Sequence, residues 1–274
     1  MFRSTLGALP FALTLYSSAF AQTTTPQFAV VDLGNLTLAG SGLTWQTEQP
    51  IQAASNFPST AAAEGSACYG VSANEIYAEY GSEAVGTTCL PVPAAHAAMW
   101  TWSTSSPQLT DLGVLPGAAG GASTGGPSSE AHGFNNVGDI VGGSDTRYAA
   151  YRNDFQVAHH AFVYNSGVMT DLGSIAGQSF YSEANSVNDS HEIVGVTNTV
   201  SSVDGSILYR AFLFTNGTMY NLTFYLVGGP TVLLTNAIWI NCQGNIAAVG
   251  TPASGGDSHA YLLVRQGAAR NCPN

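Results

Sequence analysis

The sequence contains no lysine, and its six basic residues are all arginines, against 17 acidic residues, which gives a formal net charge of −11. Charged residues make up only 8% of the chain, whereas about 25% is usual in globular domains. Proteins that bind nucleic acid or an anionic membrane surface need clustered Lys and Arg, so neither partner is expected. The 45% of hydrophobic residues are enough to build a core, which argues against a disordered chain.

Long hydrophobic runs are also lacking. One short run, residues 6–15, follows Arg3 and precedes Ala19-Phe20-Ala21. This order is typical of a secretory signal peptide, and the run is too short to span a membrane, so no membrane insertion is expected. We predict a signal peptide over residues 1–21 and a single domain over residues 22–274. The protein is expected to be a secreted or extracellular monomer, with the periplasm as the alternative location.

Cysteine is scarce, with four residues at Cys68, Cys89, Cys242 and Cys272. An even number of cysteines in a secreted chain favours structural disulfides over a reactive thiol. Three connectivities are possible, and we expect the two local pairs, Cys68 with Cys89 and Cys242 with Cys272. No Cys/His spacing resembles a zinc site.

One strand–turn–strand pattern occurs three times. In residues 160–173, the apolar stretch His-Ala-Phe-Val-Tyr is followed by Asn-Ser-Gly and then by a strand ending in Asp-Leu-Gly. Residues 210–222 repeat the pattern, and residues 96–113 repeat it with a longer turn. Asn-Gly and Ser-Gly suit tight turns because their backbones accept positive φ, so each segment predicts a β-hairpin.

Two further patterns lie between the hairpins. The segment Ser-x-Ala-x-x-x-Asn occurs at residues 129–135 and 182–188, residues 235–241 match it, and residues 66–72 fit it loosely. A short strand ending in Val-Gly recurs at residues 84–86, 140–142, 193–195 and 248–250. Each unit is thus predicted to hold four short strands.

The two ends of the chain complement one another. Residues 28–34 end in Asp-Leu-Gly with no His-Ala strand before them, and residues 259–264 form a His-Ala strand with no Asp-Leu-Gly after it. Pairing the N-terminal strand with the C-terminal strands would close a ring and remove an exposed sheet edge. The sequence therefore predicts an all-β fold, a β-propeller with four blades of four antiparallel strands. An open β-solenoid is the alternative.

The His-Ala-Phe opening, the Asp-Leu-Gly strand and the Ser-x-Ala…Val-Gly segment together resemble the HAF-repeat family of predicted extracellular proteins. The resemblance covers nearly all of residues 28–265. Arg210 in place of His and Asn221 in place of Asp depart from the pattern. The resemblance implies secretion and repetition, and it implies no reaction and no set of catalytic residues.

Three His–Asp pairs are expected from the hairpin register. A two-residue turn at Ser166-Gly167 places Phe162 opposite Asp171 and His160 opposite Gly173, so that His160 and Asp171 become diagonal neighbours within hydrogen-bonding reach. A pair repeated around a ring is expected to hold the fold rather than to catalyse a reaction. The expected structural pairs are His96 with Asp111, His160 with Asp171, and His259 with Asp32.

One repeated position, just before the strand that we expect to be innermost in each unit, offers a candidate binding site. It contains Glu130, Glu183, Asn236 and, less surely, Ala67, with His132 and Asn185 two residues after the glutamates. If these strands line a central channel, Glu130 and Glu183 converge at one mouth. Paired carboxylates suit acid–base chemistry on a glycoside or Ca²⁺ binding. The alternative is that these residues are solvated side chains that cap strand ends.

The leading functional prediction is a non-enzymatic binding or structural module whose ligand is a carbohydrate or a cell-envelope polymer. The alternative is a polysaccharide hydrolase or lyase that acts through Glu130 and Glu183. No cofactor or metal is expected, except that Ca²⁺ is a weak possibility. The chain has four tryptophans, Trp45, Trp100, Trp102 and Trp239. Their ring faces could stack on sugars, but core packing is favoured for Trp100 and Trp239 because they lie in strands.

Overall fold

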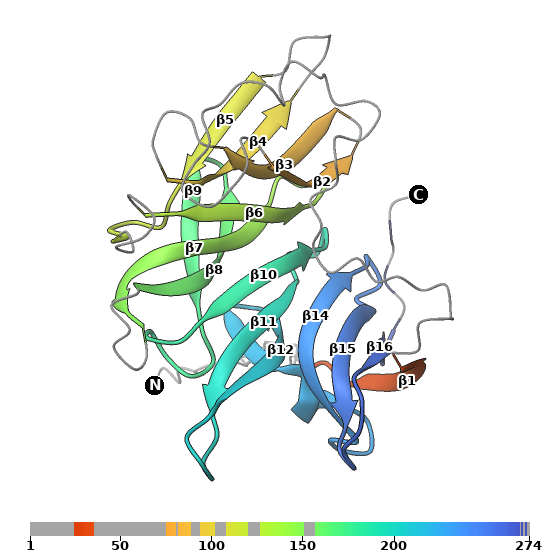
Figure 1. Cartoon of the computed structure of the whole chain (residues 1–274). Helices are drawn as coiled ribbons and strands as arrows, with labels where there is room; N and C mark the ends of the chain where they lie inside the picture. The colour runs from red at the N-terminus through yellow and green to blue at the C-terminus, as the bar shows by residue number, and fades with distance from the viewer. Residues whose placement is uncertain are drawn as a thin grey trace, which may run out of the picture.

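The computed structural model describes residues 25–35, 75–80, 82–88, 94–101, 108–119, 127–150, 157–268, 270 and 272. Over these residues the chain is all-β and forms four antiparallel sheets of four strands (Figure 1). The first sheet holds β2 (Glu75–Tyr80), β3 (Glu83–Thr88), β4 (His96–Thr101) and β5 (Gln108–Gly113). The second holds β6 (Ser129–Phe134), β7 (Ile140–Ala149), β8 (Val157–Asn165) and β9 (Val168–Gly173).

The third sheet holds β10 (Ser182–Val187), β11 (Ile193–Val200), β12 (Ile207–Thr215) and β13 (Thr218–Asn221), which runs into the short 3-10 helix η1 (Leu222–Tyr225). The fourth holds β14 (Val232–Ile240), β15 (Ile246–Pro252), β16 (His259–Arg265) and β1 (Phe28–Asn35). In the part of the chain covered by these ranges, no helix is both long and apolar enough to cross a membrane.

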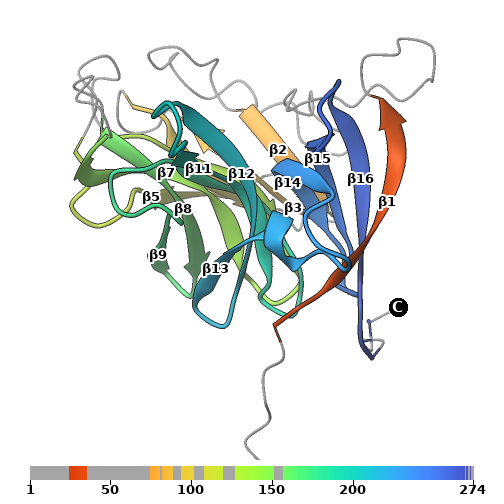
Figure 2. The ribbon, with the colours of Figure 1, turned by 90° about the horizontal axis from the view of Figure 1, so that it is seen from below.

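The two ends of the chain meet in the fourth sheet. β1 pairs antiparallel with β16, from Phe28 opposite Arg265 to Asn35 opposite His259. Figure 2 shows β1 alongside β16 at the outer edge of this sheet. The pairing of the N-terminal strand with the C-terminal strands, which the sequence predicts, is therefore present.

The two short hairpins turn where the sequence predicts. Ser166 and Gly167 have φ values of 51° and 86°, and Asn216 and Gly217 have 51° and 73°. Two consecutive residues with positive φ match the right-handed twist of the flanking strands. These turns join β8 to β9 and β12 to β13.

The Asp-Leu-Gly motif is a β-bulge, which corrects the predicted register. Phe162 lies opposite Asp171 as predicted, but Gly173 lies opposite Ala161 and not opposite His160. Leu172 is an extra residue, and the Asp171 carboxylate accepts a hydrogen bond from the backbone N–H of Gly173 at 2.7 Å. The same bulge occurs at Leu112 and Leu33, and the glycines after all three bulges have positive φ.

The first strand of each sheet (β2, β6, β10 or β14) is called its inner strand below. In the second and third sheets, the glycine of the Val-Gly strand is required because the inner strand approaches it closely. A Cβ on Gly142 would lie 1.9 Å from the carbonyl oxygen of Glu130, and one on Gly195 would lie 2.0 Å from that of Glu183. In the fourth sheet the prediction is wrong by two residues, because Ala248 and not Gly250 lies opposite Ala237. Gly250 lies two residues further along β15, opposite Leu234, beyond a second bulge of β14 between Leu234 and Asn236.

The hydrophobic core lies between successive sheets. Val85 of the first sheet packs in one cluster with Ala131 and Phe162 of the second. Further clusters join the second sheet to the third and the third to the fourth. The repeated serine adds a polar link: Ser182 Oγ accepts a hydrogen bond from Ala161 N and donates one to Gly173 O, and Ser129 does the same with Ala97 N and Gly113 O.

A disulfide joins Cys242 to Cys272, with a Cα–Cα distance of 5.7 Å, as the local pairing predicts. The predicted signal peptide and Cys68, Cys89, Trp45 and Trp102 lie outside the described residues. In the described residues the first strand of the first sheet is β2, and the predicted segment at residues 66–72 lies outside them. The residue in register with Glu130 is accordingly Glu75 and not Ala67, which also lies outside the described residues.

Candidate functional site

Each expected His–Asp pair is a direct contact between neighbouring strands. The distance from His Nδ1 to the nearest carboxylate oxygen is 3.1 Å for His96 and Asp111, 2.8 Å for His160 and Asp171, and 2.8 Å for His259 and Asp32. Burial alone would raise the pKa of Asp171, but hydrogen bonds from His160 and Gly173 N hold it below its ordinary value. The carboxylate thus fixes both its own bulge and the histidine of the neighbouring strand.

In the third sheet, Asn221 replaces the aspartate and Arg210 replaces the histidine, and the Asn221 side chain keeps the contact to the backbone. Asn221 Oδ1 accepts a hydrogen bond from Thr223 N at 3.1 Å and caps the 3-10 helix η1. Arg210 turns away and donates to its neighbouring carbonyl, Tyr209 O, at 2.7 Å. The aspartate position therefore serves the backbone in all four sheets, and the histidine contact is an addition in three of them.

The inner strands β2, β6, β10 and β14 carry a second set of contacts, between successive sheets. Each strand has a bulge, at Tyr77, His132, Asn185 and Ile238 respectively. His132 Nδ1 lies 3.0 Å from Glu183 Oε1 of the third sheet. Asn185 Nδ2 donates at 2.8 Å to Asn236 Oδ1 of the fourth. The bulge residue of one sheet thus contacts a side chain on the inner strand of the next sheet, which is Glu183 in the third sheet and Asn236 in the fourth.

Glu130, His132 and Glu183 form a compact group of titratable side chains. His132 Nε2 lies 3.7 Å from Glu130 Oε2, and the Tyr77 ring lies 5.0 Å from the His132 ring. One potential ligand atom from each of the three residues lies within 4.8 Å of the other two. The side chains of His132 and Glu183 are 8% and 10% exposed, while Glu130 is more open at 34%. The predicted convergence of Glu130 and Glu183 is therefore mediated by His132.

The surroundings favour an ionised Glu130. Burial would raise its pKa, but hydrogen bonds from His132 and Tyr77 and the charges of His132 and His159 together hold the pKa below its ordinary value. A carboxylate in this state serves as a base or a ligand. A general acid needs a raised pKa.

A cavity of about 570 Å³ opens where the ends of the four inner strands meet. Its lining comes from β2, β6, β10 and β14 and the turns that follow them, and it includes His132, Asn185 and the exposed aromatic residues Tyr80 and Trp239. The core position expected for Trp239 is wrong, because this side chain is 55% exposed, whereas Trp100 is buried as expected. Trp239 directly follows the bulge of β14 at Ile238.

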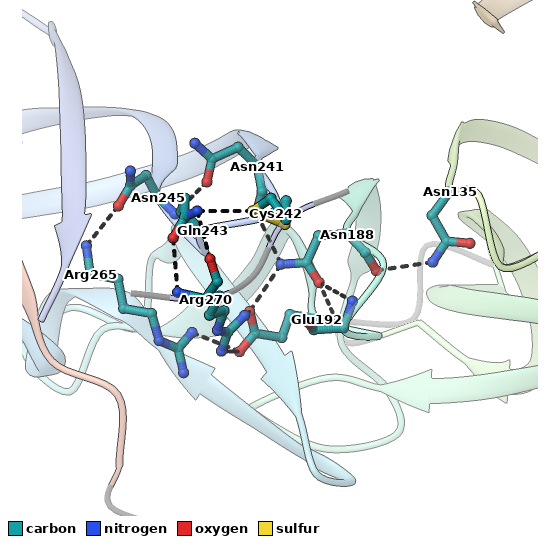
Figure 3. A network of polar contacts seen from close by, with 11 residues as sticks. Asn135, Asn188, Glu192, Asn241, Cys242, Gln243, Asn245, Arg265 and Arg270 are labelled. Atoms are coloured by element: carbon teal, nitrogen blue, oxygen red, sulfur yellow. Dashed lines mark hydrogen bonds and ion pairs between the residues drawn. A yellow bond between two sulfur atoms is a disulfide. The ribbon is translucent and has the colours of Figure 1, made fainter. Parts of the chain in front are cut away.

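The turns at the rim of the cavity are held by a chain of asparagines (Figure 3). Asn135 Nδ2 donates to Asn188 O at 2.9 Å, and Asn188 Nδ2 donates to Asn241 O at 3.0 Å. Asn188 also donates to the carboxylate of Glu192, which Arg265 and Arg270 approach from the other side. Burial would raise the pKa of Glu192, but its hydrogen bonds with Arg270 and Asn188 and the nearby arginine charges lower it.

Several residues of this region were not found from the sequence. Tyr77 was missed because the first unit lacks the Ser-x-Ala signature. Glu192 was missed because its arginine partners lie 73 and 78 residues away. His159 carried a usable signal, since it precedes the repeated His-Ala pair at a position occupied by Ala95, Tyr209 and Ser258 in the other units.

Comparisons of the chain with protein-family models, with curated protein sequences and with solved structures gave no match. The conclusions about this site accordingly rest on its own residues and geometry.

Proposed function

We propose that the protein is a secreted four-bladed β-propeller of the HAF-repeat type that binds a neutral glycan in the cavity at the ends of its inner strands. The glycan is a carbohydrate chain of the extracellular space or the cell envelope. The observation that carries this proposal is the composition of the cavity lining. Among the described residues, the lining combines exposed aromatic rings with amide side chains and contains neither Lys nor Arg.

Three features support the closed ring. β1 completes the fourth sheet, hydrophobic clusters join successive sheets, and all four inner strands contribute to one cavity. Small-angle X-ray scattering tests this part of the proposal. A closed ring gives the profile of a short cylinder, whereas the profile of an elongated arc would contradict it.

The chemistry of the cavity suits uncharged sugars. Trp239 and Tyr80 present apolar ring faces to solvent, which pack on the C–H faces of sugar rings, while asparagine side chains offer both donors and acceptors to hydroxyl groups. The net charge of −11 disfavours polyanions. Glycans without acidic groups are therefore the favoured ligands.

The test is a glycan-array screen followed by calorimetry on the glycans that bind. Trp239→Ala is expected to weaken binding at least tenfold. The matched control is Phe224→Ala, which removes an exposed aromatic ring that lies outside the cavity lining. Absence of binding to any array glycan, or equal loss in both variants, would contradict the proposal.

The hydrolase or lyase alternative remains a prediction. Its test is a panel of polysaccharides, with turnover by the wild type that disappears in Glu130→Gln and Glu183→Gln while folding is kept. The low pKa of Glu130 does not favour the general-acid role that glycoside hydrolysis requires.

A further inference from the structure

One histidine next to the Glu130, His132 and Glu183 group has an open coordination position. His159 Nε2 is buried and has no hydrogen-bond partner among the described residues. Its other ring nitrogen, Nδ1, lies 3.4 Å from Asp145 Oδ1, and its ring stacks on Tyr181 at 5.7 Å between centroids. Asp145 is itself fixed by the N–H and the hydroxyl of Ser128. A carboxylate on one ring nitrogen that orients the other is the usual support of a metal-binding histidine.

Gly143 makes the space that the His159 ring occupies beside Glu183. A Cβ on Gly143 would lie 2.1 Å from His159 Nε2 and 3.2 Å from Glu183 Cγ, so both side chains converge over this glycine. Gly143 is also the strand partner of Glu130. At the equivalent position the other sheets carry Thr87, Val196 and Val249. Only the second sheet therefore has room for this histidine.

These residues break the repeat together. Gly143, His159 and His132 each differ from their counterparts in the other three sheets, although the strands that carry them keep the common register. A requirement of the fold would recur in every sheet, as the Asp-Leu-Gly bulge nearly does. A specific combination found once points to a ligand.

We propose that Glu130, His132, Glu183 and His159 bind one divalent transition-metal ion, with Zn²⁺ as the best match. Imidazole nitrogens and carboxylate oxygens are ligands that Zn²⁺ accepts in tetrahedral sites. Ca²⁺ prefers six to eight oxygen ligands, so this set does not suit it. Two carboxylates also balance the charge of a divalent ion.

The metal site would lie beside the cavity, because His132 belongs both to the group and to the cavity lining. The proposal does not depend on glycan binding, and it is tested without any glycan present.

The experiment uses the untagged protein, stripped with a chelator and dialysed against Zn²⁺, Mn²⁺ or Ca²⁺, with elemental analysis of the bound metal. One equivalent of Zn²⁺ per chain is expected, with no Ca²⁺ at the same free concentration. His132→Gln, His159→Gln and Glu183→Gln are each expected to weaken Zn²⁺ binding at least tenfold. His191→Gln is the control, since His191 is an exposed histidine that pairs with Asp139 outside the group, and it should leave binding unchanged.

A second readout on the wild type removes any dependence on the folding of the variants. Co²⁺ added to the stripped protein is expected to give visible absorption bands of a four-coordinate nitrogen–oxygen site, and Zn²⁺ should displace them. Absence of these bands, absence of bound Zn²⁺, preference for Ca²⁺, or unchanged Zn²⁺ binding in folded variants would each overturn the proposal. In that case His132 acts as an ion-pair bridge between two carboxylates.

Discussion

The junction between the second and third sheets and the junction between the third and fourth have the same backbone plan and different chemistry. At the first, the bulge residue His132 contacts the carboxylate of Glu183. At the second, the bulge residue Asn185 donates to the amide oxygen of Asn236. The bulge sets the reach of each side chain, and the residue type decides whether the junction is charged. The neutral junction shows that this backbone plan can form with amide side chains alone.

The glycines show the same distinction between positions required by the backbone and positions required by one side chain. Gly142 and Gly195 face the backbone of the inner strand in their own sheets, so they serve the shared architecture. Gly143 faces the side chain of His159, which occurs in one sheet only. Positions that repeat are constrained by the fold, and the departures from the repeat mark the candidate site.

The largest loss of stability is expected from Gly195→Ala. Its new Cβ would lie 2.0 Å from the backbone oxygen of Glu183, which cannot move without separating two paired strands. We expect a loss of about 3 kcal/mol in the free energy of unfolding, measured by urea denaturation. Gly143→Ala is the comparison, because its Cβ would meet a side chain that can rotate away. Equal losses in the two variants would show that both glycines serve the architecture alone.

Ser182→Ala tests the link that is common to two junctions. The hydroxyl bridges Ala161 N and Gly173 O, and its removal leaves two backbone groups without this partner. The expected loss is about 2 to 3 kcal/mol in the same assay. Ser174→Ala is the control, since its hydroxyl makes one exposed hydrogen bond within a turn. A loss below that of the control would contradict the assigned role of the serine.

Much of this architecture follows from the sequence, because turn residues and alternating strands report local geometry. The unit pattern predicts the four sheets, the short hairpins and the meeting of the chain ends. The proximity of His160 and Asp171 also follows, since diagonal neighbours remain in reach when a bulge shifts one of them.

The errors have a common physical cause. A bulge adds one residue to one strand, so counting along the chain loses register there. The bulge at Leu172 moved Gly173 away from the predicted partner His160. The bulge at Ile238 interrupts the alternation of faces in β14 just before the exposed Trp239. Contacts between sheets, such as Glu192 with Arg265, depend on how two units pack and are not encoded within either.

Glu192→Gln tests a charged contact at the rim of the neutral junction. The Glu192 side chain is 3% exposed and pairs with Arg265 and Arg270. Because its pKa is lowered in the folded protein, its contribution is fully present above the ordinary glutamate pKa and is lost as the pH falls through the folded value. We expect a loss of about 2 kcal/mol at pH 7, reduced because both arginines are partly exposed, and a smaller difference from wild type below about pH 4.

The measurement is urea denaturation of both proteins from pH 7 to pH 3. Glu83→Gln is the control, because Glu83 has no ion pair within the described part of the chain, and it should lose much less stability than Glu192→Gln at pH 7. A difference between Glu192→Gln and wild type that stays constant with pH would show that the carboxylate charge contributes nothing.

The smallest change in stability is expected when the charged junction is converted into the neutral one. The double variant His132→Asn with Glu183→Asn places at the second and third sheets the residue types that Asn185 and Asn236 already use one junction further on. Because the bulges share the same register, the two amides are expected to pair, and the free energy of unfolding should change by less than about 1 kcal/mol. Binding of Zn²⁺ should be lost in the same protein. If instead the variant unfolds, the ionisable residues are part of the architecture, and the contrast between the two junctions is one of stability rather than of ligand binding.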